Sequence, residues 1–122
     1  MAKWVADQVL DGALTVLRGA TRMVAVAGQP ANFTAAWTGR LAEVPMAPAD
    51  FIIGPGDISG RKVEVAAKPG VPVFAAGSAD HVALVNQAAS QLLYVTTCPA
   101  QVLAAGGSVS FDGWSVEIAA PQ

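Results

Sequence analysis

Charge is scarce in this chain. Its 122 residues include 7 Lys and Arg and 9 Asp and Glu, so 13% of the residues are charged, against about a quarter in an ordinary soluble domain. The formal net charge is −2, and Arg61–Lys62 is the one adjacent basic pair. Binding to nucleic acid needs a positive stripe that neutralises phosphates. We therefore expect no nucleic-acid partner.

Long apolar runs and cysteines are also missing. No uninterrupted apolar run reaches the ~18 residues of a membrane span, so we expect no membrane partner. The N-terminal segment meets Asp7 and Asp11 before any long apolar stretch, a pattern unlike a secretory signal. Cys98 is the single cysteine. It cannot form an internal disulfide, and it fits a protein made in a reducing cytoplasm.

Side chains for catalysis are few, with His81 the one histidine and Cys98 the one cysteine. A Cys–His pair needs both groups within hydrogen-bond reach and an orienting partner. Strand pairing would place Cys98 opposite residues 78–79, a few residues from His81. Asp80 is adjacent to His81, but neighbours along a strand point to opposite faces. We interpret Cys98 as a small buried thiol, and predict no catalytic residues and no enzyme activity.

Metal ligands are equally few. A zinc site needs three or four converging His, Cys or carboxylate groups, and one histidine with one cysteine cannot supply them. Asp50, Asp57 and Asp80 could meet in space, but no loop has the alternating acids of a calcium site. The sequence therefore predicts no metal and no cofactor.

Apolar residues are abundant instead, at 53% of the chain, many of them alanine and valine. A chain of this length forms one domain and buries roughly two-thirds of its unfolded surface. With so little charge to cover the remainder, part of the apolar excess is expected to meet a partner. A homo-oligomer, dimer or trimer, is the expected form. The alternative is that exposed alanines inflate the apolar fraction.

The stretch Gly77–Thr97 organises the rest of the sequence. Two apolar runs, His81–Val85 and Leu92–Thr97, flank a small polar loop, Asn86–Gln91, which predicts a β-hairpin. Both runs are apolar on both faces, and such strands are covered on both faces. The hairpin therefore either lies in the middle of a packed sheet or contacts another molecule.

The N-terminal segment has helical periodicity. Residues 4–20 have the pattern of a helix face with Gly19 as its C-cap; alternatively, the helix covers only residues 6–19 and residues 1–5 form an extended arm. Trp4 then either anchors the arm on a neighbouring subunit or closes the core of its own domain. Apolar residues recur at three- and four-residue spacing at Val5, Val9, Leu10, Ala13, Leu14, Val16 and Leu17.

Three further segments carry local signals. Asn32 is expected to cap a short helical turn that places Phe33 and Trp37 on one face. Asp50–Gly60 holds three glycines and a proline, typical of a shaped surface loop. Pro99–Ala104 is expected to form a helical turn.

Strands with turn signals about every ten residues make up the remainder, which is typical of an antiparallel β-sandwich or jelly-roll-like domain. Asp112–Gly113 is expected to join the last two strands in a tight hairpin. We therefore predict a mainly β domain over residues 1–122, with one N-terminal α-helix and a sandwich over residues 23–119. The expected strands are Met23–Ala27, Leu41–Met46, Arg61–Ala67, Val71–Ala76, His81–Val85, Leu92–Thr97, Val109–Phe111 and Trp114–Ala119.

Five short motifs follow one another in a fixed order. They are D-x-V-L-D-x-[AG]-L at Asp7–Leu14, Q-P-x-x-[FY]-x-x-A at Gln29–Ala36, G-D-x-S-G-R-K-V at Gly56–Val63, G-x-A-x-H-x-A-L-V at Gly77–Val85 and L-L-x-V-T at Leu92–Thr96. Together they resemble a family of small virion proteins of tailed bacteriophages. No catalytic residues belong to the pattern.

The resemblance implies a structural role, most plausibly a capsid decoration or cement protein. Such proteins bind the outside of an icosahedral shell and clamp neighbouring capsid subunits, commonly as dimers or trimers. The implied partner is the major capsid protein, and the implied location is the capsid surface of a virion made in the host bacterial cytoplasm. A tail or head–tail connector protein is the alternative within the virion.

Two segments are the expected contacts with that partner. The first is the arm, with Trp4 and Val5; the second is the loop around residues 51–61, with Phe51, Ile52, Ile53 and Arg61. A carbohydrate-binding module remains a further alternative, because an aromatic ring can stack on a sugar. Trp37, in a loop after Phe33, is its candidate residue.

Overall fold

The computed structural model describes residues 3–120, so Met1 and Ala2 of the predicted arm lie outside the described residues. The protein is mainly β, with 50% of residues in strands and 18% in helices. Its elements in chain order are α1 (Asp7–Arg18), β1 (Arg22–Val26), α2 (Phe33–Thr38), β2 (Arg40–Pro45), the 3-10 turn η1 (Pro48–Asp50), β3 (Phe51–Pro55), β4 (Arg61–Val65), β5 (Lys68–Pro72), β6 (Gly77–Asn86), β7 (Gln91–Leu103), β8 (Ser108–Phe111) and β9 (Trp114–Ile118).

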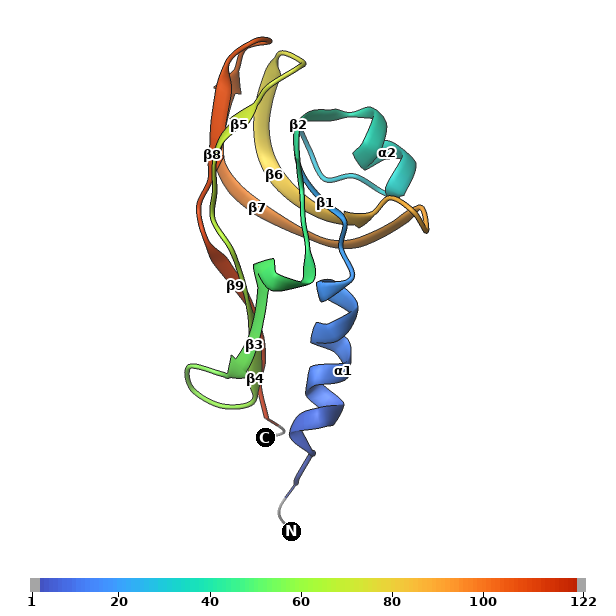
Figure 1. Cartoon of the computed structure of the whole chain (residues 1–122), viewed down its shortest axis with the longest axis vertical. Helices are drawn as coiled ribbons and strands as arrows, with labels where there is room; N and C mark the ends of the chain where they lie inside the picture. Colours follow the sequence, from blue (N-terminus) through green and yellow to red (C-terminus); the bar gives the residue numbers. More distant parts are fainter. Residues whose placement is uncertain (1–2, 121–122) are drawn as a thin grey trace.

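The strands form three antiparallel sheets (Figure 1). Sheet A has the order β2-β1-β6-β7, sheet B the order β3-β4-β9, and sheet C pairs β5 with β8. Their inner faces share one hydrophobic core with α1. The predicted class, an antiparallel mainly β domain with one N-terminal helix, is confirmed and is consistent with a β-sandwich. None of the helices within residues 3–120 is long and apolar enough to cross a membrane.

The predicted central hairpin is present as β6 and β7 and is longer than expected. Its inner face continues across the sheet in registered rows such as Met23, Leu84 and Tyr94, and Met23 and Leu84 are fully buried. The outer face carries a second cluster, in which Trp37 of α2 packs over Val24 and Ala83. The second face is thus covered by the chain's own α2, so it gives no support for a covering partner there.

Helix α1 confirms the predicted N-terminal helix. Asp7 lies in its first turn and Arg18 in its last, as the helix dipole favours. Leu14 and Leu17 are buried in the core. The predicted apolar stripe is wider than the buried face, because Val9 and Val16 are 63% and 60% exposed.

The predicted loop Asp50–Gly60 is wrong over its first half. Residues Phe51–Pro55 form β3, which pairs with β4 in full register, and only residues 56–60 form a loop. Phe51 and Val65 face each other in this pairing and both are buried. Burial of Phe51 against β4 therefore outweighs the glycine and proline signals of the segment.

Two predictions near the C-terminus are also wrong. Pro99–Ala104 is not helical, because β7 continues as a strand to Leu103. The strands flanking Asp112–Gly113 do not form a hairpin, since β8 pairs with β5 and β9 with β4. Asp112–Gly113 instead carries the chain from sheet C to sheet B.

By contrast, the Asn32 cap is confirmed: its Oδ1 accepts a hydrogen bond from the Ala35 amide at 2.8 Å.

The registered core makes a stability prediction. Leu84→Ala removes a side chain with 0% exposure and should lower the free energy of unfolding by about 2–5 kcal/mol, measured by chemical denaturation. Val102, on the same hairpin but 85% exposed, is the matched control. Val102→Ala should change stability by less than ~0.5 kcal/mol. Equal effects of the two changes would show that the row through Leu84 is not the core.

Candidate functional site

Three of the exposed large apolar side chains lie at one end of the molecule, whereas others, such as Val102 and Phe74, lie on different elements. The N-terminal segment, the start of α1 and the loop between β3 and β4 lie at the same end in Figure 1, and α1 contacts both strands. We call residues 3–9 together with loop 56–60 the arm–loop end. Within it Trp4 is 83% exposed, Val9 63% and Ile58 94%. The arm and the loop, predicted separately from the sequence, therefore lie at the same end of the molecule (Figure 1).

Loop 56–60 has a fixed shape that only glycine permits at its two ends. The Gly56 amide donates to the Gly60 carbonyl at 2.9 Å. Gly60 has a φ of +71°, and a Cβ there would lie 1.9 Å from the Ile118 carbonyl oxygen. A Cβ on Gly56 would lie 2.0 Å from the Ser59 carbonyl oxygen. Ile58 lies within this closed loop, and its side chain is 94% exposed.

Polar contacts hold this loop to the adjoining strands. Lys62 Nζ lies 2.6 Å from Asp57 Oδ1, and the Asp57 amide donates to the Glu117 carboxylate at 2.5 Å. The Ala120 amide donates to Ser59 Oγ at 3.2 Å. Hydrogen bonds from Lys62 to the carboxylates of Asp57 and Glu64 raise the pKa of Lys62. The charges around Ile58 are therefore engaged within the chain.

Arg61 ties the loop to the helix. Its Nε and Nη2 donate to the two carboxylate oxygens of Asp11 at 2.8 and 3.2 Å, and Asp7 Oδ2 lies 4.0 Å from its Nη1. The bond to Asp11 raises the pKa of Arg61. Such two-point pairing fixes orientation as well as distance. Arg61, predicted as a partner contact, positions α1 against β4 in the structure.

The other predicted contact residues occupy different environments. Phe51 is 3% exposed and packs in the core, and Ile53 is half-buried against that core. Val5 is half-buried, whereas Ile52 is 63% exposed. Ile58 is not among the individual contact residues predicted from the sequence. Its exposure could have been predicted, because an isoleucine between the turn residues Asp57 and Ser59 has no strand to pack in.

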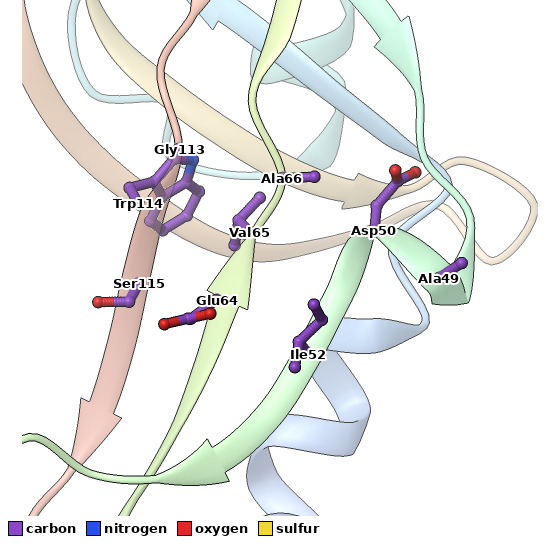
Figure 2. Close-up of a pocket in the computed structure, with 9 residues that line it drawn as sticks. All are labelled: Ala49, Asp50, Ile52, Glu64, Val65, Ala66, Gly113, Trp114 and Ser115. Carbon is purple, nitrogen blue, oxygen red and sulfur yellow. The ribbon is translucent and has the colours of Figure 1, made fainter.

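Ile52 also lines a shallow pocket on the outer face of sheet B (Figure 2). The pocket has a volume of about 380 Å³. Ile52, Glu64 and Ser115 form a registered row across its three strands. Its two carboxylates are paired, Asp50 with Lys68 at 2.8 Å and Glu64 with Lys62 at 3.3 Å. Paired acids of this kind do not offer a free general base.

The single histidine and cysteine lie near a bulge in the central hairpin. The register shifts between Ala79 and His81, and Asp80 Oδ1 lies 2.7 Å from His81 Nδ1, against the expectation that the two point apart. The Gly28 amide donates to the same oxygen at 2.7 Å. The hydrogen bond with His81, followed by that from Gly28, lowers the pKa of Asp80.

Cys98 is half-buried and lines a second pocket of about 350 Å³. Burial, followed by the negative charge of Asp80, raises the pKa of the Cys98 thiol. A nucleophilic cysteine needs the opposite shift, because the thiolate is the reactive form. Cys98 is thus half-buried at a pocket, where the sequence predicts a buried thiol.

Trp37 is less available than a sugar-stacking ring would be. The Phe33 ring stacks on it at 5.8 Å between centroids, and the Arg40 guanidinium carbon lies 3.8 Å from its centroid. Trp37 also packs on the outer cluster of sheet A. Its contacts are those of a residue that fixes α2 to the sheet.

Within residues 3–120, no three His, Cys, Asp or Glu side chains converge as a metal site requires. The three aspartates that the sequence allowed to meet have separate partners. Asp50 pairs with Lys68, Asp57 with Lys62, and Asp80 with His81.

Asp50 makes a prediction about acid stability. The hydrogen bond from Lys68 lowers its pKa below the ordinary 3.8, outweighing the opposing effect of burial, and the Ala47 amide adds to the lowering. The ionised carboxylate therefore stabilises the fold above that pH, and this stabilisation is lost as pH falls below 3.8. Asp50→Asn should lower stability at neutral pH and flatten its acid dependence, measured by thermal unfolding from pH 7 to about 2.5.

The control for this prediction is Asp112→Asn, at an exposed aspartate in the segment that links sheet C to sheet B. It should leave the acid dependence as in the unaltered chain. If Asp50→Asn and the unaltered protein lose stability in parallel on acidification, the Lys68 contact does not contribute.

Comparison with known proteins adds no assignment. No family model matches the chain, no curated protein is significantly similar to it, and no solved structure matches its fold.

Proposed function

We propose that this chain is a non-enzymatic structural protein that binds the outside of a tailed-phage capsid and stabilises subunit junctions as a decoration or cement protein. The observation that carries the proposal is the exposure of Trp4 and Ile58 at one end of the molecule, at 83% and 94%. The motif resemblance supplies the phage context, and the exposed end supplies a means of attachment.

Trp4 has the properties of an interface anchor. Tryptophan is enriched among the few residues that dominate binding energy, and it buries a large area at small conformational cost. Its position before α1 places it outside the main core, since the core cluster begins at Leu14. Most of the charged side chains around it are paired within the chain. Binding through this end would therefore not leave a buried charge without a partner.

Ile58 adds a second, rigid contact. Loop 56–60 is closed by its own backbone bond and held by Lys62, Glu117 and Ala120. A loop that is already ordered loses little entropy on binding, so more of the contact energy appears as affinity. An apolar side chain at its tip fits a concave apolar site at a junction between subunits.

On a capsid shell, the affinity of each individual contact can be modest. Many copies bind equivalent sites, and any linkage between copies raises the effective concentration of each. Two apolar anchors of moderate strength are then sufficient. The raised pKa of the Cys98 thiol and the paired acids of the sheet B pocket give no comparable support for catalysis.

The test is occupancy on purified capsids. Trp4→Ala should weaken binding by roughly thirtyfold, as expected for loss of an anchor worth about 2 kcal/mol, and deletion of residues 1–5 should do at least as much. Copy number per particle, by quantitative mass spectrometry or cryo-electron microscopy, is the measurement. Ile58→Ser should weaken binding in the same direction.

The matched control is Phe74→Ala, an aromatic side chain that is 50% exposed in the segment between β5 and β6. It should leave occupancy unchanged. Unchanged occupancy after deletion of residues 1–5 and in Ile58→Ser would reject the arm–loop end as the attachment site. Copurification with tails or connectors, and not with capsids, would reject the decoration role in favour of another position in the virion.

A further inference from the structure

The two edges of sheet A differ in chemistry. The β2 edge is charged on its outer face, where Glu43 lies 3.8 Å from Arg22 and 3.6 Å from Arg40. It is also covered, because the amides of Phe74 and Ala75 donate to the Leu41 carbonyl at 3.1 and 3.3 Å. These are the devices by which proteins protect an edge strand from pairing.

Among residues 3–120, the β7 edge has neither charged side chains nor a segment bonded to its outer backbone groups. Its 13 residues, Gln91–Leu103, include no charged side chain. Within the part of the chain that the structure describes, the backbone hydrogen bonds of β7 join it to β6 alone. A long uncharged edge with free backbone groups is a template for another strand.

Burial along β7 points to the same edge. On β6, each residue from Val82 to Val85 is buried, at 8% exposure or less. Their partners on β7, from Leu92 to Thr96, are all half-buried. The apolar rows of sheet A thus continue to its last strand and remain incompletely covered there.

The outer face shows how a second copy would complete one row. Glu43, Val24, Ala83 and Val95 lie side by side across the four strands. The row is charged at the β2 edge and apolar at the β7 edge, where Val95 packs in the cluster under α2. A second copy that presents the same strand continues valine with valine, and registered apolar pairs stabilise sheets.

Two irregularities define the segment available for pairing. The register shifts between Leu84 and Val85, and again between Ala79 and His81. Pro99 lies in the second irregularity and has no N–H to donate. The regular segment between them is Tyr94–Thr97, which we call the β7 edge segment.

We propose that two copies of this chain pair through the β7 edge segment, antiparallel about a two-fold axis, and join their two sheets A into one continuous sheet. The axis passes beside Val95, so that Val95 faces Val95 and Tyr94 faces Thr96 of the other copy, and the same segment serves both copies as a two-fold interface requires. A ladder of this length buries less than the ~800 Å² per partner of a standard interface. The dimer is therefore weak and reversible, and it is independent of the arm–loop end proposed for capsid binding.

Sedimentation of the unaltered protein from roughly 10 μM to 1 mM, the range of weak association, tests the pairing. The mass should rise with concentration toward twice the 12.4 kDa of one chain. Thr97→Lys places a charge at an exposed position of the edge and should weaken the dimer by at least about tenfold. Thr15→Lys, at an exposed position on α1, is the matched control and should leave the dimer intact.

Hydrogen exchange of the unaltered protein gives a second readout that does not depend on a variant. Amide exchange within Tyr94–Thr97 should slow as the protein concentration rises, while exchange at residues 104–107 stays constant. A monomer at every concentration, or a dimer weakened by Thr15→Lys and not by Thr97→Lys, overturns the proposal. Capsid binding by a strictly monomeric protein would reject the pairing and leave the proposed function standing.

Discussion

The burial of β6 on both faces is the constraint on which the structure depends. Every side chain from Val82 to Val85 is excluded from water, so alternate residues need cover on opposite sides of sheet A. Sheets B and C and α1 contribute to the core on one side, and α2 with Trp37 packs on the other. A strand buried in this way leaves little freedom to its neighbours, and β1 and β7 follow it in register.

The parts of the fold that the sequence predicted correctly are those with local causes. The hairpin of β6 and β7, the helix ending before Gly19 and the Asn32 cap each depend on residues a few positions apart. The failures are non-local. Asp112–Gly113 has the composition of a tight hairpin, but β8 and β9 find partners more than 30 residues away, in β5 and β4.

The same division holds for the candidate site. Composition indicates Trp4 and the glycine-rich segment, but the packing of α1 against the start of β4 depends on Arg61 and Asp11, which are 50 positions apart. No local sequence pattern predicts such a pair. Phe51 was assigned to the surface because glycines and prolines follow it, whereas its pairing with Val65 buries it.

The contact between loop 56–60 and the end of the described chain has a practical consequence. Ser59 accepts a hydrogen bond from the Ala120 amide, and Gly60 lies against Ile118. The exit from β9 therefore packs directly against the loop. The N-terminal segment and the exit from β9 therefore both lie at the arm–loop end (Figure 1). A peptide or fluorescent protein fused at either place would stand between this surface and anything it binds. Cargo intended for display belongs at the turn between β7 and β8, at the opposite end of the molecule (Figure 1).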